Sequence, residues 1–319
     1  MKIVCLDGYT LNPGDNPWDD VECLGDLTVH DRTSPDEILS RAAGAEILLT
    51  NKTPLNADTL SALPDLKFIS VLATGFNVVD IEAARKRHIP VSNVPVYGTD
   101  TVAQYVFALL LNHAHHAAHH HERVLNGEWA KRGDFCFWDT PLIELAGLTM
   151  GIVGFGRIGR RTAELAHAFG MRVIAADVQH SDAPDYPGFE WKTVEALFAE
   201  ADVVSLHCPQ TLDNTEFVNK SLLIKMKSSA FLINTARGGL VNEQDLADAL
   251  NQGTLAGAAV DVVSKEPITA DNPLLRAKNI TITPHMAWGT LSARKRLMKT
   301  TADNIRAFLD GTPQHVVNP

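Results

Sequence analysis

Residues 149–177 read TMGIVGFGRIGRRTAELAHAFGMRVIAAD, and this stretch decides the fold. An apolar run at 150–153 predicts a buried strand, which enters a glycine-rich turn and then an amphipathic helical pattern. A second apolar run at 173–176 ends in Asp177. Strand, glycine turn, helix, strand and acid follow one another in the order that a dinucleotide-binding unit requires.

The three glycines of this turn have separate expected tasks. Gly154 makes the turn, Gly156 lets the backbone approach a pyrophosphate, and Gly159 packs the helix against the strand. The first helical turn, which contains Arg157 and Ile158, offers N–H groups and the positive end of the helix dipole to phosphates. The turn is therefore predicted to bind a dinucleotide.

Asp177 indicates which dinucleotide binds. A carboxylate at this strand end accepts hydrogen bonds from the ribose 2′-hydroxyl of NAD and repels the 2′-phosphate of NADP. Residues 178–180, Val-Gln-His, include no Arg or Lys that could receive such a phosphate. The alternative is that Asp177 only caps the following turn. The glycines before it favour the NAD interpretation.

Length and charge exclude several classes of protein. A chain of 319 residues is long for one compact unit, so two domains are expected. The net charge of −10 argues against nucleic acid as a partner and against an anionic membrane surface. No apolar run approaches the roughly 18 residues that a membrane span needs.

The N-terminus and the cysteines indicate a cytoplasmic protein. The opening MKIVCLDGYT enters a strand-like run and lacks the features of a signal peptide. Cys5, Cys23, Cys136 and Cys208 are scattered without CxxC spacing, which is typical of reduced thiols and not of a disulfide frame or a zinc site.

Short apolar runs alternate with helical patterns on both sides of the glycine turn. Strands are predicted at 2–6, 47–50, 68–72 and 89–92, and then at 203–207, 231–234, 256–262 and 280–283. Helices are predicted at 36–43, 80–86, 101–126, 242–251 and 291–309. Near-continuous apolar strands are covered on both faces. The fold class is therefore α/β, with two doubly wound parallel sheets.

A segment after the long helix carries many aromatic side chains. Residues 127–141 include Trp129, Phe135, Phe137 and Trp138. So much apolar area on a loop more often marks an interface than a free surface. We therefore expect a homodimer.

Three later strands lead into residues capable of chemistry. Arg237, Glu266 and His285 follow the runs at 231–234, 256–262 and 280–283. Ligands of open parallel sheets bind beyond the carboxyl ends of the strands, so these side chains are expected at one crevice. Taken singly, each has an ordinary alternative: Arg237 could form a surface ion pair, Glu266 could lie in a solvated turn, and His285 could be a buried histidine with its hydrogen bonds satisfied.

Together these three residues suit the reduction of a 2-oxo acid by NADH. The planar guanidinium of Arg237 can bind a carboxylate bidentately. The imidazole of His285 can exchange a proton with the carbonyl oxygen near neutral pH. Glu266 can orient that imidazole and favour its protonated form. Small 2-oxo and 2-hydroxy acids are the expected substrates.

The chain resembles the D-isomer-specific 2-hydroxyacid dehydrogenase family along nearly its whole length. The matching segments are VLATGFNVVD (71–80), GTDTVAQYVFALLL (98–111), GIVGFGRIGR (151–160), FLINTARGGLVNEQDLADAL (231–250), AAVDVVSKEP (258–267) and ITPHMAW (282–288). The resemblance implies that Arg237, Glu266 and His285 are catalytic. It also implies that the backbone at Thr74 and Gly75 cradles the substrate carboxylate.

The resemblance has further implications for cofactor and domains. Residues expected to border NAD are Thr101, Cys208, Pro209, Thr235, Ala236 and Asp261. Residues 1–100 with 290–319 would form a discontinuous, flavodoxin-like substrate domain. Residues 101–289 would form an inserted Rossmann NAD-binding domain.

Within the family, DFCFWDTPLIELAG (134–147) and the HMAWG ending resemble the glycerate dehydrogenases, also called hydroxypyruvate reductases. The expected reaction is therefore reduction of hydroxypyruvate to D-glycerate. Glyoxylate, pyruvate or phosphoglycerate enzymes of the same family are the alternatives. Trp288 either lines the substrate pocket or packs at the domain hinge. An NADH-sensing interaction protein is a rival from another class, disfavoured because the chain shows no extended tail.

A histidine run occupies the predicted long helix. His113, His115, His116, His119, His120 and His121 lie within nine residues. Pairs four residues apart would share a helix face, a spacing that can chelate a metal. No third ligand is evident nearby, so we interpret the run as polar and interfacial positions and expect no functional metal.

Overall fold

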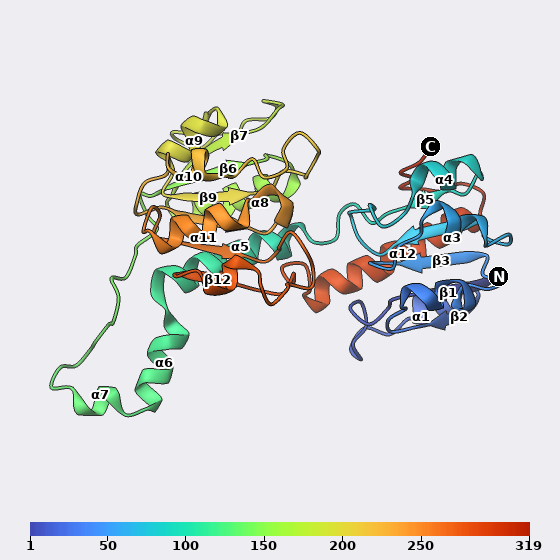
Figure 1. Ribbon diagram of the computed structural model, residues 1–319, viewed down its shortest axis with the longest axis horizontal. Coiled ribbons are helices and arrows are strands. Elements are labelled where there is room, and N and C mark those ends of the chain that lie inside the picture. The colour runs from blue at the N-terminus through green and yellow to red at the C-terminus, as the bar shows by residue number, and fades with distance from the viewer. The chain divides into compact units, whose positions relative to one another are not determined.

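The computed structural model describes residues 1–319, whose contacts group into two compact units. Unit 1 contains Met1–Gly98 and Trp288–Pro319, and unit 2 contains Thr99–Ala287. Unit 2 is thus inserted in the sequence of unit 1, which holds both ends of the chain (Figure 1). Both units are parallel sheets covered by helices, so the predicted fold class is confirmed.

Unit 1 has a five-stranded sheet in the order β2-β1-β3-β4-β5, which is the flavodoxin-like order. Its strands are β1 Lys2–Cys5, β2 Asp26–Val29, β3 Ile47–Thr50, β4 Phe68–Val71 and β5 Val91–Ser92. Its helices are α1 Asp19–Glu22, η1 Pro35–Glu37, α2 Ile38–Arg41, α3 Ala57–Ser61, α4 Ile81–Lys86 and α12 Leu291–Leu309.

The sheet of unit 1 is buried on both faces because side chains alternate along each strand. Leu48 and Ile69 belong to the core on one face, and Leu49 and Phe68 belong to the core on the other. The Phe68 ring stacks on Phe308 of α12 with ring centroids 4.6 Å apart. The last helix of the chain therefore completes the core of the first unit.

Unit 2 has a seven-stranded parallel sheet in the order β12-β11-β10-β9-β6-β7-β8. Its strands are β6 Thr149–Val153, β7 Arg172–Ala176, β8 Glu190–Trp191, β9 Val203–Leu206, β10 Phe231–Asn234, β11 Gly257–Val260 and β12 Ile280–Ile282. Its helices are α5 Thr99–His115, α6 Ala117–Leu125, α7 Glu128–Lys131, α8 Arg157–Ala168, α9 Val194–Glu200, α10 Lys220–Leu223, η2 Gly238–Leu240, α11 Glu243–Asn251 and η3 Pro273–Arg276.

Helices cover both faces of this second sheet. Phe107 of α5 and Ala166 of α8 pack on one face, whereas Phe198 of α9, Leu223 of α10 and Leu246 of α11 pack on the other. The strand order reverses between β6 and β9, which makes their carboxyl ends the switch point of a Rossmann-type sheet. None of the helices is long and apolar enough to cross a membrane.

The predicted strands agree with the structure to within two residues. The predictions missed β2 and β8, each of which lies at one edge of its sheet. Both carry exposed residues and so lack the apolar run that marks a central strand.

The prediction of one helix over residues 101–126 was wrong. The helix breaks at His116, which has a left-handed φ of 45° and separates α5 from α6. The N–H of Ile143 donates to the carbonyl oxygen of Ala114 at 3.1 Å, an oxygen that a continuing helix would need for its own hydrogen bond. A contact with the returning chain therefore accompanies the end of α5.

We call residues 117–141 the arm. Figure 1 shows α6 and α7 standing out from the sheet of unit 2, with an extended segment returning to β6. Oδ2 of Asp139 lies 2.8 Å from Nε2 of His119 and 3.2 Å from Nη1 of Arg123. These interactions tie the returning segment to α6. Large apolar side chains left exposed on the arm are Val124, Leu125, Trp129, Phe135 and Trp138.

Candidate active site

The glycine turn after β6 is shaped by close backbone contacts. Gly154 has φ of 91°, and a Cβ there would overlap the backbone nitrogen of Cys208. A Cβ at Gly159 would overlap the carbonyl oxygen of Gly154. A Cβ at Gly156, by contrast, would meet no atom within 4 Å. Gly154 and Gly159 therefore permit close packing, and Gly156 leaves open space over the turn.

The start of α8 has donors that no side chain caps. Gly156 is the N-cap residue and offers no side-chain acceptor. The first N–H groups of a helix, here those of the turn that includes Arg157 and Ile158, have no intrahelical partner. Uncapped N–H groups beside open space fit the pyrophosphate of a dinucleotide.

Asp177 is bound to the glycine turn itself. Its Oδ2 accepts the N–H of Phe155 at 2.5 Å, and its Oδ1 accepts the N–H of Gln179 at 3.3 Å. The carboxylate thus joins the end of β7 to the turn after β6, as well as capping its own turn.

The turn after β10 presents Arg237. The buried side chain of Asn234 accepts the N–H of Ala236 at 3.0 Å and donates to the carbonyl oxygen of Arg237 at 2.8 Å. The hydroxyl of Thr235 is buried without a hydrogen-bond partner. A buried hydroxyl without a partner is expected to find one in a bound ligand. This turn therefore also fits a bound cofactor.

A second close approach lies beside Arg237. A Cβ at Gly238 would overlap the carbonyl group of Val263, in the loop after β11. Glu243, at the first position of α11, holds the same loop by accepting the N–H of Ser264 at 2.6 Å and the Asn272 amide at 2.9 Å. Glu243 was not identified from the sequence, where it is one acid among several on a helix.

The loops after β11 and β12 bring Glu266 and His285 together. Oε2 of Glu266 lies 2.7 Å from Nδ1 of His285, and both side chains are partly exposed. A carboxylate can only accept, so Nδ1 carries the proton of this hydrogen bond. His285 has a left-handed φ of 53°, and its N–H donates to the carbonyl oxygen of Asp261 at 2.7 Å.

The side chain of Asp261 holds the loop that carries His285. Its Oδ1 accepts the Thr283 hydroxyl at 2.6 Å and the N–H of Met286 at 2.9 Å. Its Oδ2 accepts the N–H of Ala287 at 2.8 Å, and the residue is only 1% exposed. The structure therefore turns this carboxylate toward the backbone of unit 2.

Other expected cofactor neighbours lie at the same edge of the sheet or at the start of α5. The turn containing Cys208 and Pro209 follows β9, and Thr101 is buried in the first turn of α5. Burial, assisted by the charge of Asp177, raises the pKa of the Cys208 thiol to about 11. Burial lowers the pKa of the preceding His207 to about 3, and that imidazole lies 2.9 Å from the Ser205 hydroxyl.

In unit 1, the loop after β4 contains Thr74 and Gly75. Neither of their backbone N–H groups donates a hydrogen bond within this unit. The Thr74 hydroxyl donates to the carbonyl oxygen of Val94 at 2.8 Å. The Trp288 and Tyr97 rings meet edge to face with centroids 6.1 Å apart, so part of the indole serves packing in unit 1.

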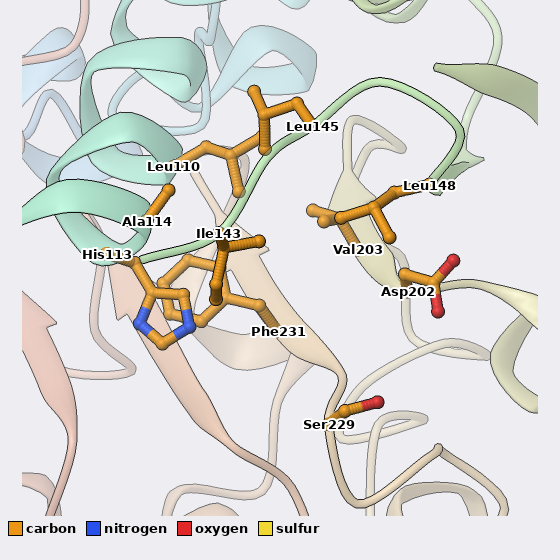
Figure 2. A pocket seen from close by; sticks show the side chains of 10 residues that line it. All are labelled: Leu110, His113, Ala114, Ile143, Leu145, Leu148, Asp202, Val203, Ser229 and Phe231. Carbon is orange, nitrogen blue, oxygen red and sulfur yellow. The ribbon is translucent and has the colours of Figure 1, made fainter. Parts of the chain in front are cut away.

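A cavity of about 170 Å³ lies at the opposite edge of the unit 2 sheet, at the amino ends of β9 and β10. Figure 2 shows the His113 ring lying over Phe231, with Leu110 and Ile143 beside them. Ligand sites of such sheets lie at the carboxyl ends, so this cavity is separate from the candidate site.

The histidine run does not assemble into a metal site. The run was expected to lie on one helix, but the break at His116 divides it between α5 and α6. His120 Nδ1 lies 2.9 Å from the carbonyl oxygen of His116, and His119 binds Asp139. No group of three His, Cys, Asp or Glu side chains is arranged to hold a metal ion.

Comparisons with known proteins agree with this geometry. Residues 107–287 match the family described as D-isomer specific 2-hydroxyacid dehydrogenase, NAD binding domain. The chain is 48% identical to a hydroxypyruvate reductase of Blautia hydrogenotrophica over 100% of both chains. It is 42% identical to a glycerate dehydrogenase of Methylorubrum extorquens over 89% of both.

A solved structure extends the likeness to the whole fold. D-lactate dehydrogenase of Aquifex aeolicus, complexed with NAD and lactic acid, has a TM-score of 0.83 and 26% identity, covering 100% of this chain and 99% of that chain. The glycine turn, the strand order and these relatives lead to one conclusion. The chain belongs to the D-isomer-specific 2-hydroxyacid dehydrogenase family.

Proposed function

We propose that the protein reduces hydroxypyruvate to D-glycerate, using NADH. NAD-dependent reduction of a 2-oxo acid follows from the family, and the names of two relatives, a hydroxypyruvate reductase and a glycerate dehydrogenase, support the choice of substrate. The observation that carries the proposal is the hydrogen bond between Glu266 and His285, at 2.7 Å, at the ends of neighbouring strands. An oriented imidazole at this edge is the proton donor that a ketone reduction needs.

Each residue of the proposed catalytic set has one task. Bound NADH supplies a hydride to the carbonyl carbon of the substrate. His285 donates a proton from Nε2 to the carbonyl oxygen, because Glu266 holds Nδ1. Arg237 binds the carboxylate and polarises the carbonyl group through its fixed guanidinium fork. In the reverse direction the same imidazole accepts the proton of the alcohol.

The proposed cofactor contacts follow the open positions of unit 2. Gly156 and the first turn of α8, with Arg157 and Ile158, take the pyrophosphate. Asp177 takes the ribose hydroxyls and disfavours a 2′-phosphate. Thr235, whose hydroxyl is buried without a partner, hydrogen-bonds to the cofactor beside Ala236. Thr101, Cys208 and Pro209 border it.

Substrate binding is also proposed for the loop after β4. The N–H groups of Thr74 and Gly75 bind the carboxylate, because they point to no acceptor in their own unit. Trp288 contributes to the substrate pocket through the part of its indole not packed on Tyr97.

A panel of 2-oxo acids tests the proposal. NADH oxidation is followed with hydroxypyruvate, glyoxylate, pyruvate and 3-phosphohydroxypyruvate, and kcat/KM is compared. We expect hydroxypyruvate to give the highest value and NADPH to be the poorer cofactor. Inactivity on every 2-oxo acid, by a protein that binds NADH, would contradict the function. A higher value for another acid would change the substrate only.

We further propose that two copies associate through the arm and that the protein is cytoplasmic. Leu125 and Phe135 are 72% and 88% exposed, which is costly for large apolar side chains in water. The four cysteines are unpaired, as is usual in a reducing compartment. Sedimentation of the wild type against Phe135→Ser tests the interface. A dimer that this variant weakens is expected, and a monomeric wild type would exclude it.

A further inference from the structure

The loop after β4 is tied to the segment after β5 by three hydrogen bonds. The N–H of Val94 donates to the carbonyl oxygen of Ala73 at 3.0 Å, and the Thr74 hydroxyl donates to the carbonyl oxygen of Val94 at 2.8 Å. Nδ2 of Asn93 donates to the carbonyl oxygen of Thr74 at 2.7 Å. Asn93 is only 8% exposed, so its amide is committed to this contact.

The bond from Asn93 determines where the N–H of Gly75 points. The carbonyl of Thr74 and the N–H of Gly75 belong to one planar trans peptide, in which the two groups point in opposite directions. Holding the carbonyl against Asn93 therefore directs the Gly75 N–H away from the core. The bond from Val94 to Ala73 directs the N–H of Thr74 in the same manner. The N–H groups of Thr74 and Gly75 are thus each oriented by a hydrogen bond to the carbonyl oxygen of the same peptide.

Asn93 is itself held by α12 and by the C-terminal tail. Asn304, which is 0% exposed, donates from Nδ2 to the carbonyl oxygen of Asn93 at 2.9 Å. Its Oδ1 lies 2.8 Å from Nδ1 of His315, and the N–H of Asn93 donates to the carbonyl oxygen of His315 at 3.2 Å. Because Asn304 presents its oxygen to His315, that imidazole carries a proton on Nδ1.

We propose that Asn93 is a positioning residue for the carboxylate of the 2-oxo acid, and that Asn304 and His315 hold it in place. The hydrogen-bonded series runs from the C-terminal tail through α12 to the N–H of Gly75. The inference rests on the proposed binding of the carboxylate at Thr74 and Gly75. All of these residues lie in unit 1, whereas the glycine turn lies in unit 2, so NADH affinity serves as an internal reference.

Two substitutions, Asn93→Asp and His315→Asp, test the series, because each removes one hydrogen-bond donor. Asn93→Asp keeps the shape but replaces the Nδ2 donor by an oxygen that repels the Thr74 carbonyl. Loss of a hydrogen bond to a charged group corresponds to about 10- to 100-fold in affinity. We expect KM for hydroxypyruvate to rise by that factor, with kcat changed less and the Kd of NADH unchanged, because a carboxylate binds alike in ground and transition states.

The pair at His315 provides the control. Its φ of 54° suits both Asn and Asp, so His315→Asn and His315→Asp share one shape, and only the Asn variant offers a donor to Asn304 while the Asp variant offers a charged acceptor. We expect a KM several-fold higher for His315→Asp than for His315→Asn, which keeps an N–H near the position of Nδ1. Equal KM values for the two variants would overturn the role of His315. This comparison also stands if Asn93→Asp fails to fold.

A crystal structure of Asn93→Asp separates this inference from the proposed function. A rotated Thr74–Gly75 peptide is expected, and an unchanged peptide would overturn the positioning role whatever the activity. A wild-type protein that turns over no 2-oxo acid would instead contradict the proposed function. A rise in the Kd of NADH matching the rise in KM would indicate general disruption and would also overturn the inference.

Discussion

Glu266 and His285 are joined by a hydrogen bond of 2.7 Å between Oε2 and Nδ1, although 19 residues separate them in the chain. General acid catalysis by such an imidazole contributes about 10²- to 10⁴-fold to a rate. We expect His285→Gln to lower kcat by this factor, since a glutamine amide cannot act as a general acid near neutral pH, and to leave the Kd of NADH unchanged. Stopped-flow NADH oxidation and fluorescence titration measure the two quantities.

Glu266→Gln provides the companion measurement for the same pair. Glutamine keeps one oxygen that can accept from Nδ1 but carries no charge, so the loss of kcat should be smaller than for His285→Gln. A His285→Gln variant with lost NADH binding would refute the assigned role, because the fault would then lie in the cofactor site.

The Glu243 carboxylate should support turnover from a distance. It holds the Ser264 backbone at 2.6 Å, two residues before Glu266. Misplacing a catalytic group by about 1 Å can cost about 10²-fold. We therefore expect Glu243→Ala to lower kcat by up to about 10²-fold at constant NADH affinity. Gln244→Ala, at the exposed neighbouring position, is the matched control, and equal kcat values for the two variants would refute the prediction.

The sequence predicted those parts of the fold that depend on local pattern. The apolar run at Phe231–Asn234 is found residue for residue as β10, and α12 begins and ends as predicted. Thr290 caps α12 by accepting the N–H of Ala293 at 3.3 Å, a local signal. The break at His116 was not predicted from local pattern, and the bond that accompanies it comes from Ile143, 29 residues beyond Ala114.

The same limit applies to the candidate site. Arg237, Glu266 and His285 stood out because chemically capable side chains followed apolar strands. The roles of the residues that hold them, or that hold the loop after β4, could not be predicted, because their hydrogen-bond partners are distant in sequence. Asn304 and Asn93 are 211 residues apart, and Asp261 and Ala287 are 26 apart. An Asn or Asp placed directly after a strand is the one local signal that Asn93 and Asp261 share.

Asp177 should determine both the affinity and the choice of cofactor. Removing a charged acceptor from the ribose costs about 1.5–3 kcal/mol, or about 10- to 100-fold in affinity. We expect Asp177→Ala to raise the Kd of NADH by this factor and that of NADPH much less. Asp185→Ala, at an exposed position in the following loop, is the control. An equal rise in the Kd of NADH and of NADPH would show that Asp177 acts only through its hydrogen bond to the turn at Phe155.

Acid should destabilise unit 2 through two partly buried histidines. Burial, with the nearby His116 charge, lowers the pKa of His113 to about 4, and burial lowers that of His207 to about 3, from an ordinary value of 6.5. Between these values and pH 6.5 the unfolded chain binds more protons than the folded one, so the free energy of unfolding decreases as the pH decreases. The stability present above pH 6.5 is therefore lost as pH falls toward 4 and then 3, by roughly 2–3 kcal/mol for His113 after allowance for its partial exposure.

Urea unfolding at pH 7.5 and pH 4.5 measures this dependence, and His113→Phe isolates one contribution. The phenyl ring can keep the stacking on Phe231, where the ring centroids lie 3.9 Å apart, but it cannot take up a proton. We expect the variant to lose less stability than the wild type between the two pH values. An equal loss in both proteins would mean that His113 titrates alike in the folded and unfolded states, and His207 and the carboxylates would then account for the acid sensitivity.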